Sequence, residues 1–226
     1  MEHVLNNPVY HALLSGDAAF AFGSDDVKFF DEQVSPFVGF ANEYESGFED
    51  LQKLFSPGRK ILYASPKKIE TPTDWKLLAE IAGLQFVLDN YVPPEEYKTQ
   101  PVTLRQKDIE AMIKLTALTK PGPFGKRTIE FGYYFGIFQN EQLVAMTGQR
   151  LHVSHFTEIS AVCTHPDHAG KGFAATLLHH QIDLILKMGQ NPFLHVRADN
   201  MRAIELYERI GFNVSRPMNF YFLQKK

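Results

Sequence analysis

The stretch FTEISAVCTHPDHAGKGFA, residues 156–174, predicts a β-strand, a glycine turn and the start of a helix in direct succession. Residues 156–165 are rich in β-branched and apolar side chains, and Pro166 cannot continue a ladder of backbone hydrogen bonds. Residues 174–188 then repeat apolar side chains at helical spacing. The turn therefore places the N-terminus of a long helix next to the end of a strand, where a ligand can be bound.

Gly170 and Gly172 open this helix and make it a candidate anion site. The first N–H groups of a helix have no partner within the helix, and the helix dipole adds partial positive charge there. Glycine has no Cβ that would keep a pyrophosphate away from these donors, and Lys171 adds a full charge. The same pattern also occurs in plain tight turns. It matches neither common nucleotide loop, because no Lys-Ser/Thr pair and no third glycine follow in register.

The segment HPDHAGKGFA, residues 165–174, resembles motif A of the GNAT acyl-CoA N-acyltransferase superfamily, whose pattern is Arg/Gln-x-x-Gly-x-Gly/Ala. Ala169 stands where the family usually has Arg or Gln, so one side-chain contact to the pyrophosphate is missing while the backbone cradle is unchanged. The resemblance implies acetyl-CoA as co-substrate and no metal. The residues that it assigns to acetyl-CoA here are Val162, Cys163, Thr164, Ala169, Gly170, Lys171, Gly172, Phe173 and Ala174.

The segment NMRAIELYERIGF, residues 200–212, resembles a second GNAT signature, Asn-x-x-Ala-x-x-Leu-Tyr-x-x-x-Gly-Phe. Asn200, Ala203 and Tyr207 fall at i, i+3 and i+7 and therefore share one face of a helix. The resemblance adds these three residues to the acetyl-CoA site, with Asn200 on the pantetheine arm or the opposite strand. It also implies Tyr207 as the catalytic phenol that protonates the departing CoA thiolate. From spacing alone, Tyr207 is equally typical of a buried tyrosine whose hydroxyl is bound by backbone.

The resemblance also implies a fold and a reaction. The expected fold is mixed α/β, with a partly antiparallel central sheet that is splayed in the middle and flanked by helices on both faces. The expected reaction moves the acetyl group of acetyl-CoA to a primary amine by direct attack in a ternary complex. A backbone N–H within residues 162–164 would polarise the thioester carbonyl, as an oxyanion donor does.

Glu158 is the one carboxylate within the predicted strand. Strict alternation puts it on one face with Phe156, Ser160, Val162 and Thr164, and puts residues 157, 159, 161, 163 and 165 on the other. Burial would raise the pKa of this carboxyl toward the range of a general base. Its sequence distance from Gly172 equals that of the proposed base in the histone-type acetyltransferases of the superfamily, so the resemblance implies that Glu158 is catalytic and contacts the acceptor amine. The alternative is a structural carboxylate paired with Arg150 or another cation.

Composition limits the class of protein. The 226 residues are 44% hydrophobic and 22% charged, with a net charge of −3, so nucleic acid is not an expected partner. No apolar run is long enough to span a bilayer, so we expect no membrane and a cytoplasmic location. The single cysteine, Cys163, excludes an internal disulfide and a thiolate metal cluster. The histidines have no fixed ligand spacing, so no zinc site is predicted.

Charge and linker composition divide the chain in two. Residues 1–98 carry 8 basic and 16 acidic side chains, whereas residues 99–226 carry 15 and 10. Residues 91–96, YVPPEE, predict an exposed linker. We thus expect two domains, at residues 1–98 and 99–226. By resemblance, the first is a divergent, degenerate GNAT-like α/β domain that shapes or covers the substrate site, and the second is the catalytic GNAT domain. In the first we expect helices at 8–16, 43–55 and from Thr73 through Leu78, and strands at 18–22, 60–64 and 84–88, with an irregular or edge segment at 29–41.

The second half follows the family's order of elements. We expect a strand at 102–105, a helix at 108–119, a hairpin of strands 131–138 and 143–153, and a strand at 191–197. Residues 120–127, KPGPFGKR, combine stiff and permissive residues with one aromatic ring, and the resemblance assigns this loop and its Phe124 to substrate binding. The alternative is a plain surface turn with Phe124 packed beneath it. His195 is interpreted as a packed or surface histidine.

The function keeps two alternatives. One is an enzyme similar to glycine N-acyltransferases that takes a larger acyl-CoA, and the other is a non-catalytic acyl-CoA-binding module. The amine acceptor can be a small molecule or a peptide, and neither its identity nor the oligomeric state, a homodimer included, follows from the residues.

Overall fold

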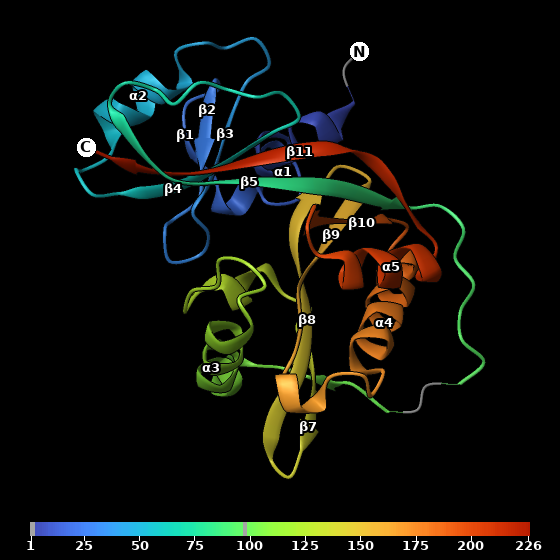
Figure 1. Cartoon of the computed structure of the whole chain (residues 1–226). Helices are drawn as coiled ribbons and strands as arrows, with labels where there is room; N and C mark the ends of the chain where they lie inside the picture. The colour runs from blue at the N-terminus through green and yellow to red at the C-terminus, as the bar shows by residue number, and fades with distance from the viewer. Residues whose placement is uncertain (1–2, 97–98) are drawn as a thin grey trace.

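The computed structural model describes residues 3–96 and 99–226, and Figure 1 shows their arrangement. The α-helices are α1 (Pro8–Leu14), α2 (Gly47–Leu54), α3 (Ile109–Thr119), α4 (Phe173–Lys187) and α5 (Met201–Ile210). The strands are β1 (Phe22–Gly23), β2 (Val27–Phe29), β3 (Phe37–Phe40), β4 (Lys60–Ser65), β5 (Trp75–Leu88), β6 (Val102–Thr103), β7 (Phe135–Gln139), β8 (Gln142–Val153), β9 (Phe156–Thr164), β10 (Asn191–Arg197) and β11 (Phe212–Lys225). Short 3₁₀ helices lie at Val4–Asn6, Ala18–Phe20, Gln106–Asp108, Thr128–Phe131 and Pro166–His168.

All of these strands form one mixed sheet, in the order β1-β2-β3-β4-β11-β5-β10-β9-β8-β7-β6. The pairs β3–β4 and β9–β10 are parallel and the other neighbours are antiparallel. In Figure 1, α3 lies on one side of the sheet and α4 and α5 on the other. The predicted fold class, a mixed and partly antiparallel sheet with flanking helices, is confirmed.

β5 corrects the expected helix from Thr73 through Leu78. Residues 75–88 form one long strand, and β11 pairs with it from one end to the other. The residues of its first half, such as Leu77, Ala79 and Glu80, are good helix formers, but pairing with a distant strand overrides a weak local preference. β5 therefore continues through the expected short strand at 84–88, where it also pairs with β10.

Other expectations for the first half are corrected in detail. The predicted strand at 18–22 is a 3₁₀ helix followed by β1, and α2 begins only at Gly47. Within 29–41, β3 is buried along its whole length between β2 and β4, so it is not an edge strand. β11, which lies next to β5, had no counterpart among the predicted elements.

The second half agrees with prediction more closely. The helices at 108–119, 174–188 and after Asn200 lie within a few residues of α3, α4 and α5, and the strands at 143–153, 156–165 and 191–197 lie within a few residues of β8, β9 and β10. In the first half, the strand at 60–64 agrees equally well with β4. The first strand of the predicted hairpin is shorter, since Phe131 ends a 3₁₀ helix, residues 132–134 lie in no regular element and β7 begins at Phe135. No helix among the described residues is long and apolar enough to cross a membrane.

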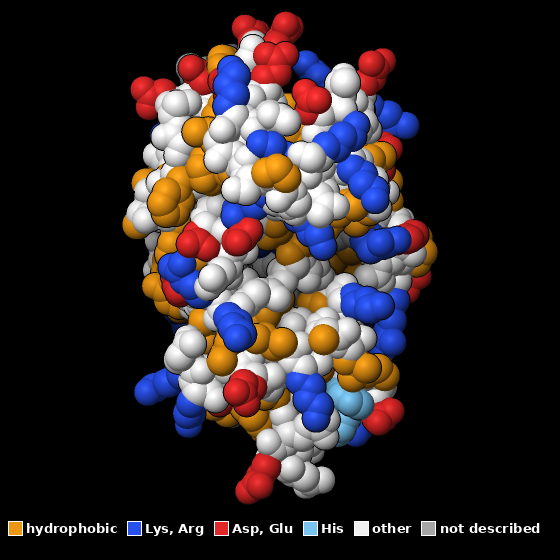
Figure 2. All heavy atoms as spheres, turned by 90° about the vertical axis from the view of Figure 1, so that its left-hand side faces the viewer, with side chains coloured by type: hydrophobic (Ala, Val, Ile, Leu, Met, Phe, Trp, Pro, Cys, Tyr) orange, Lys and Arg blue, Asp and Glu red, His pale blue; other side chains and the backbone are white. Residues whose placement is uncertain are grey.

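The predicted boundary between residues 98 and 99 adjoins positions 97 and 98, which lie outside the described residues, and the division into two domains stays a prediction. Segments from both sides of it are packed together. The buried Asp17, just after α1, accepts hydrogen bonds from the backbone N–H of His152 at 3.0 Å and lies 2.7 Å from its Nδ1. The face in Figure 2 is hollowed near its middle, and Lys and Arg side chains lie around the hollow.

Candidate functional site

The site lies where β9 and β10 separate. Their parallel pairing covers only Phe156–Glu158 of β9 and Asn191–Phe193 of β10. Beyond Glu158 the described residues place no strand against this edge of β9, and a cavity of about 720 Å³ opens there. The lining includes eleven of the predicted acetyl-CoA residues: Val162, Cys163, Thr164, Ala169, Gly170, Gly172, Phe173, Ala174, Asn200, Ala203 and Tyr207. Lys171 is not part of the lining, and its Nζ lies 3.2 Å from Nδ1 of His168.

A β-bulge in β9 shapes the cavity wall. Met146 pairs with Cys163 and Gly148 with Ser160, so β9 has one residue more than β8 in this interval. Ala161 takes up the extra length in the left-handed region, with φ of 54°, and it lines the cavity. Because a side chain other than glycine is strained there, the bulge is a built feature of the site. It leaves backbone polar groups of the splayed segment outside the regular ladder.

The bulge also corrects the strict alternation expected along this strand. Ala161 and Cys163 belong to the apolar cluster that includes Phe156, whereas Val162 packs in the cluster of Ile159 under α4 and α5. Alternation had placed Phe156 with Val162 and Ile159 with Ala161. The extra residue at Ala161 exchanges the two faces from that point on.

The glycine turn has the geometry that an anion cradle needs. Gly170 and Gly172 have φ of +81° and +82°, and Gly172 is the N-cap of α4. A Cβ placed on either glycine would meet no other atom within 4 Å, so open space borders both. The first turn of α4 thus presents its unpaired N–H groups beside the cavity, as predicted from the sequence.

α5 supplies the opposite wall. Asn200 lies at its N-cap, and the Asn200 side chain accepts a hydrogen bond from the backbone N–H of Ala203 at 3.3 Å. Tyr207 is buried, and burial raises its pKa to about 12. Within the described residues no hydrogen bond joins the Tyr207 hydroxyl to the backbone, so the alternative of a backbone-bound tyrosine is not what the structure has.

Glu158 lies beneath the cavity and not in its lining. It is 0% exposed, and Nε and Nη2 of Arg150 donate to its two carboxylate oxygens at 2.7 and 2.5 Å. Nδ1 of His195 lies 2.7 Å from Oε1. The pairing with Arg150 that the alternative expects is present.

The pKa of Glu158 is the reverse of the expectation. Burial by itself would raise the pKa of this carboxyl, but the charge of Arg150 and the hydrogen bonds from Arg150 and His195 hold it at about 2. A carboxyl with so low a pKa, whose two oxygens both hold donors, is a weak proton acceptor at neutral pH. The catalytic role of Glu158 stays a prediction, and its environment favours the structural alternative.

Sequence reasoning did not predict that Arg150 and His195 line the cavity. A second register shift lies between the pairs Gln149–Ile159 and His152–Thr157, and here β8 has one residue more than β9. This shift turns Arg150 toward the cavity, and Arg150 and His195 both line its wall. Nε2 of His195 lies 3.0 Å from Nε2 of Gln85 on β5, which also donates to the Leu5 carbonyl at 2.9 Å. This donor makes Nε2 of His195 an acceptor and assigns the ring proton to Nδ1, toward Glu158.

The loop at 120–127 lies over a small cavity of about 10 Å³, room for about one water, and this cavity shares lining residues with the main one. Phe124 lines it, and its ring meets that of Tyr134 edge-on at 5.8 Å between centroids. Phe124 is thus packed underneath, as the plain-turn alternative expects, and it also borders a cavity. Arg150, Ser160 and Ala161 line both cavities.

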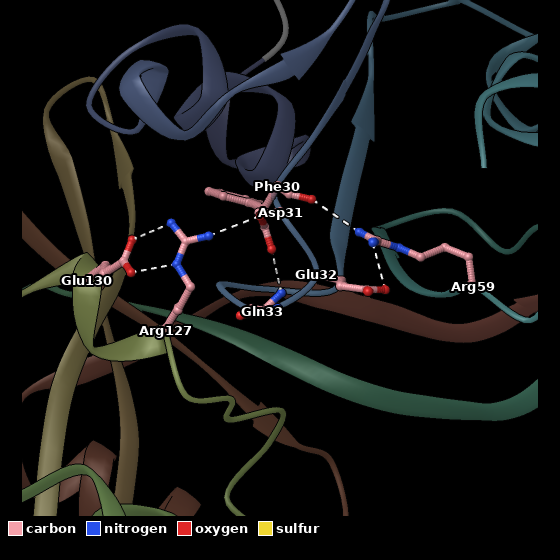
Figure 3. Close-up of polar contacts among 7 residues, drawn as sticks. All are labelled: Phe30, Asp31, Glu32, Gln33, Arg59, Arg127 and Glu130. Atoms are coloured by element: carbon pink, nitrogen blue, oxygen red, sulfur yellow. Dashed lines mark hydrogen bonds and ion pairs between the residues drawn. The ribbon is translucent and has the colours of Figure 1, made fainter. Parts of the chain in front are cut away.

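Residues of the first half hold this loop (Figure 3). Arg127 binds Asp31 at 3.0 Å and makes a two-pronged contact with Glu130 at 2.6 and 2.9 Å. The backbone adds to the contact, since the N–H of Arg127 donates to the Gln33 carbonyl at 3.2 Å. The neighbouring pair in Figure 3, Arg59 and Glu32, does not line either cavity.

The charge of the main cavity is positive. Its lining contains five Lys and Arg side chains and one acidic residue, Glu205; the cations are Lys120, Arg150, Arg197, Arg202 and Arg209. A concave surface lined by one sign of charge concentrates ligands of the other sign. The site therefore suits a ligand with several phosphates.

Comparisons with known proteins agree with this geometry. The model of a family described as FR47-like protein matches residues 134–221. The ribosomal protein bS18-alanine N-acetyltransferase of Escherichia coli K12 is 33% identical over 89 residues, which are 39% of this chain and 60% of that enzyme. The spermidine N(1)-acetyltransferase of Vibrio cholerae is 44% identical over 50 residues, 21% of this chain and 28% of that enzyme. The matched segment thus spans less than two thirds of each relative.

Solved structures extend the likeness to the whole chain. A GNAT-family protein from Novosphingobium aromaticivorans has a TM-score of 0.92 and 29% identity, over 100% of both chains. A GCN5-related N-acetyltransferase from Kribbella flavida, 15% identical, shares the fold with a TM-score of 0.63 over 96% of this chain and 94% of that one. The splayed sheet with its glycine turn is that of an acyl-CoA N-acyltransferase-like protein. The chain belongs to the GNAT superfamily.

Proposed function

We propose that the protein is an N-acetyltransferase that moves the acetyl group of acetyl-CoA to a primary amine by direct attack in a ternary complex. The observation that carries the proposal is the basic cavity between the separated ends of β9 and β10, with the glycine turn of α4 at its wall. The relatives named above act on amines, the alanine of ribosomal protein bS18 in one case and spermidine in the other.

The residues present suit the pyrophosphate of acetyl-CoA. The open space beside Gly170 and Gly172 lets an anion reach the first N–H groups of α4. Ala169, in place of the usual Arg or Gln, removes one side-chain donor, and the backbone donors and the basic lining remain. Oγ1 of Thr164 is buried in the cavity wall without a hydrogen-bond partner among the described residues, so a polar group of the ligand can bind there.

The reaction forms a bond from the amine nitrogen to the carbonyl carbon and breaks the bond from that carbon to sulfur. A proton leaves the nitrogen and a proton reaches the sulfur. Backbone N–H groups near the Ala161 bulge are suited to stabilise the negative charge on the carbonyl oxygen. Tyr207, with its pKa raised by burial, stays protonated at neutral pH and can donate a hydrogen bond to the departing thiolate.

We infer that Glu158 serves this reaction through Arg150 and His195. Its oxygens hold three donors from these two residues, which in turn line the cavity. A base that removes a proton from the ammonium directly would need at least one free oxygen and a higher pKa. In this proposal the acceptor loses its proton to water.

Titration calorimetry with acetyl-CoA, CoA and a long-chain acyl-CoA tests the binding half of the proposal, and release of CoA in the presence of amines tests transfer. We expect acetyl-CoA to bind and transfer to follow. A preference for the long acyl chain would contradict the choice of acetyl-CoA, and binding with no transfer to any amine would contradict the enzyme.

Gly172→Ala and Gly189→Ala form a matched pair for the cradle. Both glycines have a positive φ and open space around them, but only Gly172 lines the cavity. Both variants bear a similar backbone strain. We expect the affinity for acetyl-CoA to fall by about tenfold or more in Gly172→Ala, because its Cβ approaches the phosphate donors, and to stay unchanged in Gly189→Ala.

A further inference from the structure

Arg150 lies where the acceptor must approach, if the proposed function holds. It lines both the main cavity and the small cavity under the loop at 120–127, as do Ser160 and Ala161. Ala161 is the bulge residue near which the thioester carbonyl is expected. A group bound by Arg150 is therefore close to the reacting nitrogen.

The guanidinium of Arg150 has a free edge. Its Nε and Nη2 donate to Glu158, and the ring of Phe37 covers one face, with the guanidinium carbon 4.8 Å from the ring centroid. Among the described residues no acceptor binds its Nη1. A guanidinium has five N–H donors in one plane, so the edge formed by Nη1 and Nη2 remains for a ligand.

The charges at this end favour an anion over a cation. Among residues 3–96 and 99–226, the lining of the small cavity contains no acidic residue, and that of the main cavity contains only Glu205, on α5. Glu158 is fully buried with both oxygens occupied, whereas the Arg150 side chain is 13% exposed. The positive end of the ion pair thus faces the cavity, and Lys120 adds a second cation to the wall. In the described lining of the small cavity, a polyamine would find no carboxylate.

We propose that the free edge of Arg150 binds a carboxylate of the acceptor, so that the acceptor is an amine with a carboxylate on a neighbouring carbon, as in an α-amino acid. The inference rests on the proposed function, since it names the substrate class of the same site. The planar fork of a guanidinium matches the two oxygens of a carboxylate, and Phe37 and Glu158 hold that fork in place. Pairing with Glu158 keeps the guanidinium neutralised while no acceptor is bound.

The wild-type protein tests this directly. Rates of CoA release are measured for α-amino acids with small, aliphatic and aromatic side chains, each beside its amide and its decarboxylated amine, and for spermidine. Each rate is corrected for the fraction of free amine. We expect kcat/KM to be at least about tenfold higher for an amino acid than for its matched amide and amine. Equal or faster transfer to spermidine or to amines without a carboxylate would overturn the assignment. It would also be overturned if the rate of CoA release rose only when a dicarboxylic acyl-CoA such as succinyl-CoA replaced acetyl-CoA.

The double variant Arg150→Gln with Glu158→Gln removes both charges together. We expect the preference for the carboxylate to fall to about one. The matched control is Arg59→Gln with Glu32→Gln, which removes the Arg–Glu pair of Figure 3 outside both cavities and should leave the preference intact. A preference that survives loss of Arg150 overturns the proposal, and if the variant does not fold, the wild-type rates decide.

The two levels of inference fail differently. Wild-type protein that binds no acyl-CoA would overturn the proposed function. Protein that binds acetyl-CoA and acetylates only amines without a carboxylate would overturn the role of Arg150 and leave the proposed function standing.

Discussion

Replacing Glu158 by Gln tests the ion pair beneath the cavity, because the change keeps the shape of the side chain and removes its charge. Glu158 is fully buried and Arg150 is 13% exposed, so water replaces little of what Arg150 loses. Loss of one partner from a buried ion pair costs about 3–5 kcal/mol. Since Arg150 reaches the cavity, we expect the lower end, about 3 kcal/mol, which corresponds to a fall in Tm of about 6–12 °C for a chain of this length.

The loss should depend on pH in one direction. Burial opposes ionisation of Glu158, but Arg150 and His195 outweigh it and hold the pKa at about 2, below the ordinary value for glutamate. A group whose pKa is depressed in the folded state stabilises the protein above its ordinary pKa of about 4.3, and this contribution is lost as the pH falls toward 2. The difference between wild type and Glu158→Gln should therefore be complete at pH 7 and narrow below about pH 4.

Urea unfolding followed by the fluorescence of the single tryptophan gives the free energy at each pH. That residue, Trp75, is buried at the start of β5 and packs in a core cluster with Leu51 and Ile61. Glu32→Gln is the control, because Glu32 also pairs with an arginine but its side chain is 61% exposed, and we expect a fall in Tm below about 3 °C. An equal effect of the two variants, or a Glu158→Gln deficit that does not narrow at low pH, would refute this account of the ion pair.

Three further outcomes are expected. Tyr207→Phe should lower kcat by about 100-fold or more and leave the free energy of unfolding nearly unchanged, because its hydroxyl has no hydrogen-bond partner among the described residues; unchanged kcat would remove the phenol from the mechanism. Arg127→Ala and Asp31→Ala should each raise KM for the amine by about two- to fivefold, since both hold the loop over the small cavity, while calorimetry should find the same affinity for acetyl-CoA. Burial raises the pKa of the Cys163 thiol to about 11, so alkylation of Cys163 should be slow at pH 7.5 and faster at higher pH. Because Cys163 lines the cavity, bound acetyl-CoA should slow the alkylation further. If no acyl-CoA protects Cys163, the ligand binds elsewhere.

The parts of the site that the sequence predicts are those set by neighbours in the chain. Gly170 and Gly172 are needed for their positive φ, and Asn200 caps the helix that follows it. These requirements appear as fixed residue types at fixed spacing. The turn and α4 could therefore be placed from the residues, and the resemblance to the two GNAT motifs added α5 and most of the residues of the cavity wall.

The parts that could not be predicted depend on distant strands. β5 contains residues that favour a helix, and its extended form is imposed by β11 along its whole length. The two bulges in β8 and β9 arise from unequal residue counts between paired strands, so no single strand reveals them. Strict alternation consequently failed beyond Ala161. Pairing of Glu158 with Arg150 was foreseen only as an alternative, and the approach of His195 was missed.

The pKa error for Glu158 has the same origin. Burial alone was visible from the sequence as a carboxylate within an apolar strand, and burial raises the pKa. The opposing effects come from Arg150 on β8 and His195 on β10, and their strength depends on distances of 2.5 to 2.7 Å that spacing does not give. A carboxylate in a strand therefore indicates a partnered group before it indicates a base.

The separation of β9 and β10 at the cavity depends on the first half of the chain. β10 pairs with β9 only over Asn191–Phe193, whereas its pairing with β5 runs from Phe193 to Arg197, which is the part that lies beside the cavity. β5 thus fixes the position of β10 where β9 has left it. Gln85 of the same strand orients His195, and Asp31 and Phe37 of the first half hold Arg127 and Arg150. The motifs proposed to bind acetyl-CoA lie in the second half of the chain. Residues of the first half hold β10, Arg127 and Arg150 in place, so the proposed acceptor preference should respond to changes in either half.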